Sequence, residues 1–303
     1  MNDLQRPEFQ DETAARKWLE AQVWPNGPFC PHCGSDNVTR LKGKKHRPGL
    51  FQCKEKPCRK QFTVTVNTLF ERSKIPLTKW LAALYLLSAS KKGISTNQLS
   101  RMLHLPYKTA WFMTHRLREA MRDNPTGPLG GAGKIVEADE TYYGRQKGVP
   151  RTGRQGPSNK LHIVSLVERG GAVRSFHVKS ANLKAVQHIL RTNVPRSTVL
   201  YTDESRLYQN VGKEYADHQT VRHADKEYVR GDVHTNSIEG YFGLFKRGMR
   251  GVYQHCGEQH LQRYLTEFDF RYSTRHTTDL ERTAIAASAI AGKRLTYRRI
   301  GSR

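Results

Sequence analysis

The chain has 303 residues, of which 51 are Lys or Arg and 27 are Asp or Glu, so its formal net charge at pH 7 is 51 − 27 = +24. A chain of this length usually divides into about two domains, and its 37% apolar content is enough to build folded cores. So large a positive charge repels itself unless a polyanion is bound. Nucleic acid is the commonest such partner, and a merely basic ribosomal or membrane-surface protein is the alternative.

Secreted and membrane-spanning classes are not expected. Residues 1–7 contain no apolar segment, so no signal peptide is predicted. The longest apolar stretch, residues 80–87, is much shorter than the roughly 20 residues needed to cross a bilayer. We therefore expect a cytoplasmic protein that associates with DNA.

Four of the five cysteines follow a short helix predicted over residues 14–23. They form two close pairs, Cys30 with Cys33 and Cys53 with Cys58, and 53 − 33 − 1 = 19 residues separate the pairs. Two such pairs about 15–20 residues apart are typical of a zinc ribbon, because each pair turns two sulfurs toward one tetrahedral ion. We predict a structural zinc site with these four ligands. Four unrelated buried cysteines are the alternative.

Positive charge is concentrated around the second cysteine pair. Residues 40–60 contain nine Lys or Arg and a single acid, Glu55. A rigid basic module suits the phosphate backbone of DNA, which positions a protein without reading sequence. We therefore predict that Lys44 and Lys45 contact phosphates.

Helices are predicted in the next part of the chain. Apolar residues at three- and four-residue spacing indicate helices over 77–87 and 110–121. Between them, Ser95 and Gln98 have the spacing of a capping box, and the short helix that they start ends before Pro106.

The last two of these helices surround a tight turn, as in a helix-turn-helix motif. In that interpretation the second helix contacts DNA through Lys108, Arg116 and Arg118. A plain helical hairpin would have the same pattern, so both interpretations stay open.

Residues 123–133 are rich in Pro and Gly and predict a linker. Beyond it, Arg169-Gly170-Gly171 indicates a hairpin, and residues 183–190 predict a helix. The segment 144–160 has five Lys or Arg and no acid, which predicts a mobile basic loop. Alternating and β-branched residues predict strands over 134–143, 161–167, 173–178 and 198–202.

Three acids occupy positions that suit metal ligands. Asp139 lies in the first predicted strand, Asp203 ends a later strand, and Glu239 lies at the start of a predicted helix. Hard divalent cations take oxygen ligands, and two ions about 4 Å apart can drive phosphoryl transfer. Each acid also has a structural alternative. Asp139 is then an exposed strand residue, Asp203 is the N-cap of a helix near Ser205, and Glu239 forms a capping box with Asn236.

The spacing of the acids favours the metal site. Between Asp203 and Glu239 there are 239 − 203 − 1 = 35 residues, and Lys246 follows Glu239 by seven. Seven residues are two helical turns, so the side chains of Glu239 and Lys246 lie on one face of the helix. We predict that Lys246 contacts DNA beside the glutamate.

Two Asp, 35 residues, a Glu and a basic residue seven positions later resemble the signature of DDE transposases and retroviral-type integrases. From about residue 10 to residue 297, the chain is similar to the ISXO-type transposases of bacterial insertion sequences. The segments that carry this similarity are the cysteine ribbon at 30–58 and the motifs at 62–68, 92–95, 108–111, 137–142, 201–203, 234–240 and 267–272.

The resemblance implies an α/β fold in which a ribonuclease-H-like domain, a mixed five-stranded sheet with flanking helices, follows a zinc ribbon and a helix-turn-helix-like region. We accordingly expect four parts: an N-terminal helix with the zinc ribbon, a helical DNA-binding region, a linker, and a catalytic domain with a basic tail. Their expected bounds are 1–72, 73–122, 123–133 and 134–303.

The same resemblance assigns Asp139, Asp203 and Glu239 as catalytic ligands of Mg²⁺ or Mn²⁺. Some relatives have Asn at the third position, so the glutamate at position 239 supports catalytic competence. The four-residue gap between Cys53 and Cys58 departs slightly from the usual ribbon and affects the geometry of that turn.

The implied function is a transposase that binds the terminal inverted repeats of an insertion sequence, cleaves DNA strands and joins them to target DNA. The implied partners are double-stranded element ends and target DNA, with a homodimer or larger assembly formed on them in the bacterial nucleoid. Two alternatives stay open: a ribonuclease-H-like nuclease that cleaves without joining, and a non-enzymatic zinc-ribbon regulator.

Overall fold

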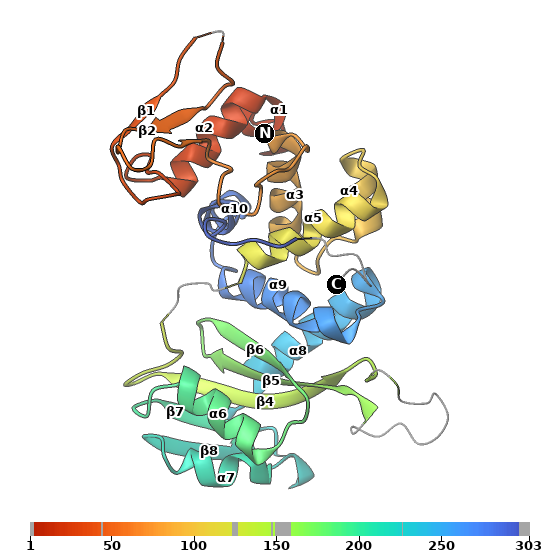
Figure 1. Ribbon diagram of the computed structural model, residues 1–303. Coiled ribbons are helices and arrows are strands. Elements are labelled where there is room, and N and C mark those ends of the chain that lie inside the picture. The colour runs from red at the N-terminus through yellow and green to blue at the C-terminus, as the bar shows by residue number, and fades with distance from the viewer. Residues whose placement is uncertain are drawn as a thin grey trace. The chain divides into compact units, whose positions relative to one another are not determined.

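The computed structural model describes residues 3–43, 45–122, 127–146, 148, 159–225 and 227–296 (Figure 1). The chain forms two compact units, one of residues 1–123 with 277–303 and the other of residues 124–276. Lys44 and most of the predicted basic loop over 144–160 lie outside the described residues.

The first unit begins with two helices, α1 (Pro7–Gln10) and α2 (Glu12–Val23), so the predicted helix over 14–23 is confirmed. The Asp11 side chain caps α2 by accepting a hydrogen bond from the Ala14 N–H at 2.8 Å. A small antiparallel sheet follows, made of β1 (Val38–Arg40), β2 (Phe51–Cys53) and β3 (Gln61–Phe62).

Three aromatic rings form the core of this small sheet. The rings of Phe51 and Phe62 stack at 5.6 Å between centroids, and Trp24 meets both of them edge-on. Such pairs add about 0.5–1.5 kcal/mol beyond the area that they bury. They stabilise a segment that is otherwise too short to build a large core.

Three helices, at the predicted places, complete the part of this unit that residues 1–123 form. The Ser95 hydroxyl accepts a hydrogen bond from the Gln98 N–H at 3.1 Å, which starts the middle helix. Pro106, whose φ of −55° suits a helix start, precedes the last helix. The helices are α3 (Leu77–Ala89), α4 (Thr96–Met102) and α5 (Tyr107–Ala120).

The C-terminal segment belongs to this first unit. A capping box starts α10 (Asp279–Ser288), which packs against α2 and α3. The Arg282 guanidinium donates a hydrogen bond to the Ser88 carbonyl at 3.1 Å, near the end of α3. The structure therefore differs from the expected domain of residues 134–303, because the partners of this last helix lie in the N-terminal unit rather than on the large sheet.

The second unit is built on a five-stranded mixed sheet of order β6-β5-β4-β7-β8. The first three strands along the chain pair antiparallel, and the last two run parallel to the first. This order and these directions are the ribonuclease-H-like arrangement that the resemblance implied. The strands are β4 (Ile135–Tyr143), β5 (Leu161–Glu168), β6 (Val173–Val178), β7 (Val199–Asp203) and β8 (Asp217–Val221).

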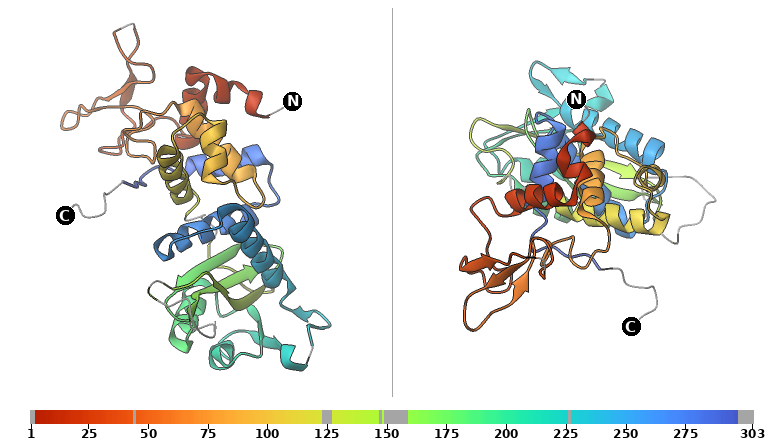
Figure 2. Two further views of the ribbon diagram at one scale, coloured as in Figure 1. Left: turned by 90° about the vertical axis from the view of Figure 1, so that its right-hand side faces the viewer. Right: turned by 90° about the horizontal axis from the view of Figure 1, so that it is seen from above.

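Helices cover both faces of this sheet (Figures 1 and 2). On one face, Val136 and Leu200 pack with residues of α6 (Leu183–Asn193) and α7 (Arg206–Gly212). On the other face, Ile163 packs with residues of α8 (Asn236–Gly248) and α9 (Leu261–Ser273). A short hairpin, β9 (Val229–Arg230) and β10 (Val233–His234), leads into α8.

Candidate active site

Two of the three predicted acids lie level with each other on adjacent strands. β4 and β7 pair in parallel with Ile135 opposite Val199, an offset of 199 − 135 = 64 residues. Asp139 and Asp203 have the same offset, 203 − 139 = 64. The two carboxylates therefore follow the paired segment at the same edge of the sheet.

Both side chains also point to the same face. Residues alternate across a strand, and Val136, Ala138 and Leu200 face the core formed with α6 and α7. Asp139 and Asp203 lie an odd number of positions from these core residues along their strands. Their side chains therefore face the opposite side of the sheet, which α8 covers.

The electrostatics of Asp139 show that acids converge here. Burial raises the pKa of Asp139 to about 8, and the negative charges of Asp203, Glu140 and Glu239 raise it further. Burial also raises the pKa of Asp203. The N-cap of α7 is Ser205 rather than Asp203, whose Oδ1 accepts the Ser205 N–H at 3.0 Å.

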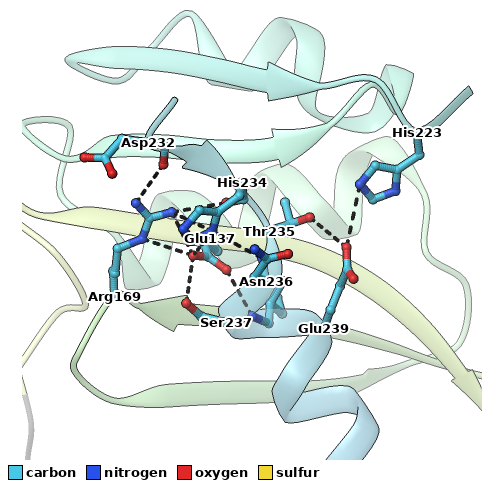
Figure 3. Close-up of polar contacts among 10 residues, drawn as sticks. Glu137, Arg169, His223, Asp232, His234, Thr235, Asn236, Ser237 and Glu239 are labelled. Carbon is cyan, nitrogen blue, oxygen red and sulfur yellow. Dashed lines mark hydrogen bonds and ion pairs between the residues drawn. The ribbon is translucent and has the colours of Figure 1, made fainter. Parts of the chain in front are cut away.

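Glu239 approaches the site from the first turn of α8. Its Oε1 accepts a hydrogen bond from the Thr235 hydroxyl at 3.0 Å and lies 3.6 Å from Nε2 of His223 (Figure 3). Thr235 is the N-cap and Asn236 the first helical residue, so the capping box considered for Asn236 does not form. The Glu239 carboxylate thus faces side chains of the site and not the backbone of its own helix.

A fully buried acid, Glu137, fixes the start of α8 (Figure 3). Its two oxygens accept hydrogen bonds from the Ser237 hydroxyl at 2.9 Å and from the Ile238 N–H at 3.0 Å. Arg169 pairs with the same carboxylate at 3.1 Å and also donates to the carbonyls of Asp232 and His234. A carboxylate at a helix N-terminus is favoured by the helix dipole, so this network holds Glu239 in place.

Lys246 lies two turns along the same helix. Its ammonium group is 5.9 Å from the centroid of the Phe242 ring. Burial and the charge of Arg250 lower the pKa of Lys246, while the negative charge of Asp139 opposes that decrease. The predicted basic residue therefore lies within electrostatic range of the acidic cluster.

Glu140 lies next to Asp139 but faces the other side of the sheet. Its Oε2 accepts a hydrogen bond from the buried Tyr208 hydroxyl of α7 at 2.7 Å. Burial raises the pKa of Glu140, while this hydrogen bond opposes the increase. The strand register thus separates the two neighbouring acids into different environments.

The basic residues predicted to bind DNA fall into two groups. Lys45 and Lys108 are exposed, the latter in the first turn of α5. Arg116 and Arg118 are buried, with 8% and 1% of their surface exposed, so neither presents its guanidinium on an open surface. The second half of α5 is buried on most of its sides, and these two side chains are buried with it.

The four cysteines of the ribbon come together as predicted. All four Sγ atoms lie within 4.8 Å of one another, with Cys30 to Cys58 at 3.7 Å and Cys33 to Cys53 at 3.6 Å. A tetrahedral ion with Zn–S bonds of about 2.3 Å places its sulfurs about 3.8 Å apart. The four thiolates therefore fit a zinc ion.

Comparisons with known proteins match both units. A transposase zinc-ribbon domain matches residues 10–61, and an ISXO2-like transposase domain matches residues 128–273. A protein of Halobacterium salinarum described as an uncharacterized protein in transposable element ISH50 is 31% identical over 281 residues, 87% of this chain and 91% of that protein. The chain belongs to the ISXO2-like transposase family.

Solved transposase structures are more distant from this transposase. The Mos1 strand transfer complex is 14% identical with a TM-score of 0.30, covering 72% of this chain and 77% of that chain. The Drosophila P element transposase strand transfer complex is 10% identical with a TM-score of 0.29, covering 67% and 58% respectively. Among the described residues of the transposase, no helix is long and apolar enough to cross a membrane.

Sequence reasoning missed the residues that surround the acids of this transposase. His223, beside Glu239, begins a short 3-10 helix, His223–Asp225, that no sequence motif marks. Arg169 was interpreted only as part of a hairpin, although it pairs with Glu137 across the sheet. The one available signal was a charged residue beside a two-glycine turn, and that signal does not specify its partner.

Proposed function

We propose that this transposase cleaves and joins DNA strands at the acidic cluster of Asp139, Asp203 and Glu239, with Mg²⁺ or Mn²⁺ as the cofactor. The observation that carries the proposal is the pKa of Asp139, which burial and three neighbouring acids raise to about 8. Carboxylates gathered in this way repel one another when ionised. A divalent cation relieves that repulsion, and carboxylate oxygens are the ligands that it prefers.

In this proposal Asp139 and Asp203 supply oxygen ligands from two adjacent strands, and Glu239 supplies a third from α8. When bound, such an ion lowers the pKa of the attacking water or hydroxyl and stabilises charge on the leaving oxygen. Lys246, on the same side of the sheet, donates to a phosphate oxygen of the DNA. Glu137 and Arg169 hold the helix that carries Glu239 and Lys246.

The substrate is double-stranded DNA in two forms, the ends of the mobile element and the target. The net charge of +24 attracts the phosphates toward an acidic pocket that would otherwise repel them. Exposed cations of the N-terminal unit, Lys45 and Lys108 among them, contact the backbone near the inverted repeats. The zinc ion at the four cysteines has a structural role, because all four positions of its tetrahedron are taken by the protein.

Cleavage with water frees a 3′ hydroxyl at the element end, and this hydroxyl then attacks a phosphate of the target DNA. Two ends must be held together for both to join one target. We therefore propose that a homodimer or larger assembly forms on DNA.

The test incubates the purified full chain with DNA carrying the flanking element ends, a target plasmid and Mg²⁺, and maps cut and joined products. Asp139→Asn, Asp203→Asn and Glu239→Gln should each lower cleavage by orders of magnitude while DNA binding is kept. The matched controls are Glu140→Gln, whose side chain faces α7, and Asp217→Asn, which is exposed at the start of β8. Normal cleavage by all three site variants would disprove the assignment.

The same assay decides between this function and a nuclease that cleaves without joining. Joined products that depend on Asp139 and Asp203 support the transposase chemistry. Cut ends without any joined product, at every target concentration tested, would favour the nuclease.

A further inference from the structure

A second candidate site lies in the helical part of the N-terminal unit. A cavity of about 630 Å³ opens beside the first turns of α5, between that helix and α3. Sites for small molecules commonly have volumes of about 300–1,000 Å³. The cavity is lined by residues of 73–80 and 107–116, none of which belongs to the acidic cluster or to the zinc site.

Aromatic side chains form much of its wall. Trp80, Tyr107, Trp111 and Phe112 all line the cavity. Trp80 is held rigidly, because its indole N–H donates to the Ser73 hydroxyl at 2.9 Å and 1% of its surface is exposed. Tyr107, by contrast, is 51% exposed, which is unusual for so large a ring. Tyr107 therefore offers a flat apolar face to a ligand that enters from solvent.

Three cations line the same cavity, Lys74, Lys108 and Arg116, and no acidic residue is present among its described lining. The guanidinium of Arg116 lies 5.5 Å from the ring centroids of both Trp80 and Phe112. The cavity therefore combines positive charge with aromatic faces, and it is complementary to an anion that carries a flat ring.

Arg116 is the decisive residue, because it is more than nine-tenths buried and incompletely paired. Its Nη2 donates to the Glu71 carbonyl at 3.2 Å, but its Nε is buried without a hydrogen-bond partner within the described part of the chain. A buried charged donor that lacks an acceptor is costly. Arg116 also lines the cavity, so an anionic ligand there would offset its positive charge.

We propose that this cavity binds one unpaired nucleotide of DNA, with the base against the aromatic wall and the phosphate near Arg116 and Lys108. Aromatic faces bind bases of any sequence, and Arg adds cation–π attraction. A base inside a duplex is stacked on both faces, so the nucleotide must leave the stack before it enters. The inference rests on DNA as the substrate in the proposed function, but not on the catalytic acids.

The position of the cavity suits this ligand. Tyr107 and Lys108 are the first two residues of α5, and the N-terminal residues of the second helix are those that approach base edges in a helix-turn-helix protein. The partial positive charge of a helix N-terminus also favours a phosphate there. A duplex that contacts this end of α5 places its nucleotides beside the mouth of the cavity.

The experiment measures binding of the full chain, without added Mg²⁺, to two duplexes of one sequence. One is fully paired, and the other carries a single unpaired 2-aminopurine nucleotide. Fluorescence anisotropy gives the two dissociation constants, and quenching of the 2-aminopurine reports its stacking on aromatic rings. We expect the wild-type chain to prefer the duplex with the unpaired nucleotide by about 5- to 150-fold, the factor expected for one base stack.

Tyr107→Ala is an exposed substitution that keeps the fold, and it should reduce the preference while leaving affinity for the paired duplex within about twofold. Lys108→Gln removes a proposed backbone contact, so it should weaken binding to both duplexes and reduce the preference as well. Met102→Ala is the matched control, because Met102 is 45% exposed on the preceding helix and does not line the cavity. It should keep the full preference.

Equal affinity of the wild-type chain for both duplexes would overturn the proposal. Quenching that is unchanged in Tyr107→Ala would also overturn it. A chain that binds free dAMP but shows no preference for the unpaired nucleotide in DNA would overturn it as well. Since no cleavage is measured, these results are independent of whether the acidic cluster is catalytic.

Discussion

Replacing Glu137 by Gln tests the idea that a buried acid holds the catalytic helix. The Glu137 carboxylate has no exposed surface and accepts hydrogen bonds from Ser237, Ile238 and Arg169 at 2.9 to 3.2 Å. An amide of the same size has a single acceptor oxygen and two N–H donors. Either the helix N-terminus or the guanidinium of Arg169 therefore loses its acceptor.

The magnitude follows from burial. Removing one partner of a buried ion pair costs about 3–5 kcal/mol, because the other charge is left uncompensated. With a urea m-value of about 1–3 kcal/mol/M, the unfolding midpoint of the second unit should fall by about 1–5 M. Cleavage should fall as well, because the substitution loosens the helix that carries Glu239.

The matched control is Glu214→Gln. Glu214 pairs with Arg191 and Arg196, but at a solvent-accessible site, where solvent and salt screen the interaction. Its removal should change the urea midpoint little. The contrast tests burial, because both substitutions remove a glutamate that pairs with arginine, one at a buried site and one at a solvent-accessible site.

The assay can observe the second unit separately. The four tryptophans, Trp18, Trp24, Trp80 and Trp111, all lie in the first unit, so their fluorescence follows that unit alone. Far-UV circular dichroism follows both units. We expect Glu137→Gln to shift the dichroism transition and to leave the tryptophan transition in place. A shift no larger than that of Glu214→Gln would refute the reasoning.

Three further predictions concern metal and charge. Purified protein should contain about one zinc per chain by metal analysis, and the double substitution Cys30→Ser with Cys33→Ser should remove it; retention of zinc would contradict the ribbon site. Because the folded-state pKa of Asp139, about 8, exceeds its ordinary value of 3.8, the folded chain binds a proton there more tightly than the unfolded chain. The metal-free protein should accordingly lose stability as pH rises from about 4 to 8, and Mg²⁺, measured by calorimetry, should bind more tightly over that range with proton release; a pH-independent affinity would contradict the assignment. DNA affinity should fall with salt at a log–log slope steeper than about −3, because each neutralised phosphate contributes about −0.9, and a shallower slope would mean few phosphate contacts.

Spacing along the chain was enough to predict the elements that depend on local order. The cysteine pairs bring their sulfurs together because each pair lies in one short turn, and the four Sγ atoms meet within 4.8 Å. The strands follow from residue periodicity, and the helix start at Ser95 follows from capping. The acids Asp139 and Asp203 were identified by their places in two strands, and the parallel register then places them level with each other.

Only the tertiary structure decided which charges are exposed and which are buried. Arg116 and Arg118 are basic residues on a helix that suits DNA binding, yet both are buried because neighbouring elements cover most sides of the second half of α5. Arg169 and Glu137 are 32 residues apart in sequence and meet only because an antiparallel strand pair returns the chain.

The C-terminal helix α10 shows the same limit, since its place in the first unit depends on surfaces of α2 and α3 that lie far from it in sequence. Local spacing determines turns, caps and strand faces because their partners are close along the chain. Long-range pairing depends on which surfaces the folded chain brings together, and no spacing in the sequence specifies it.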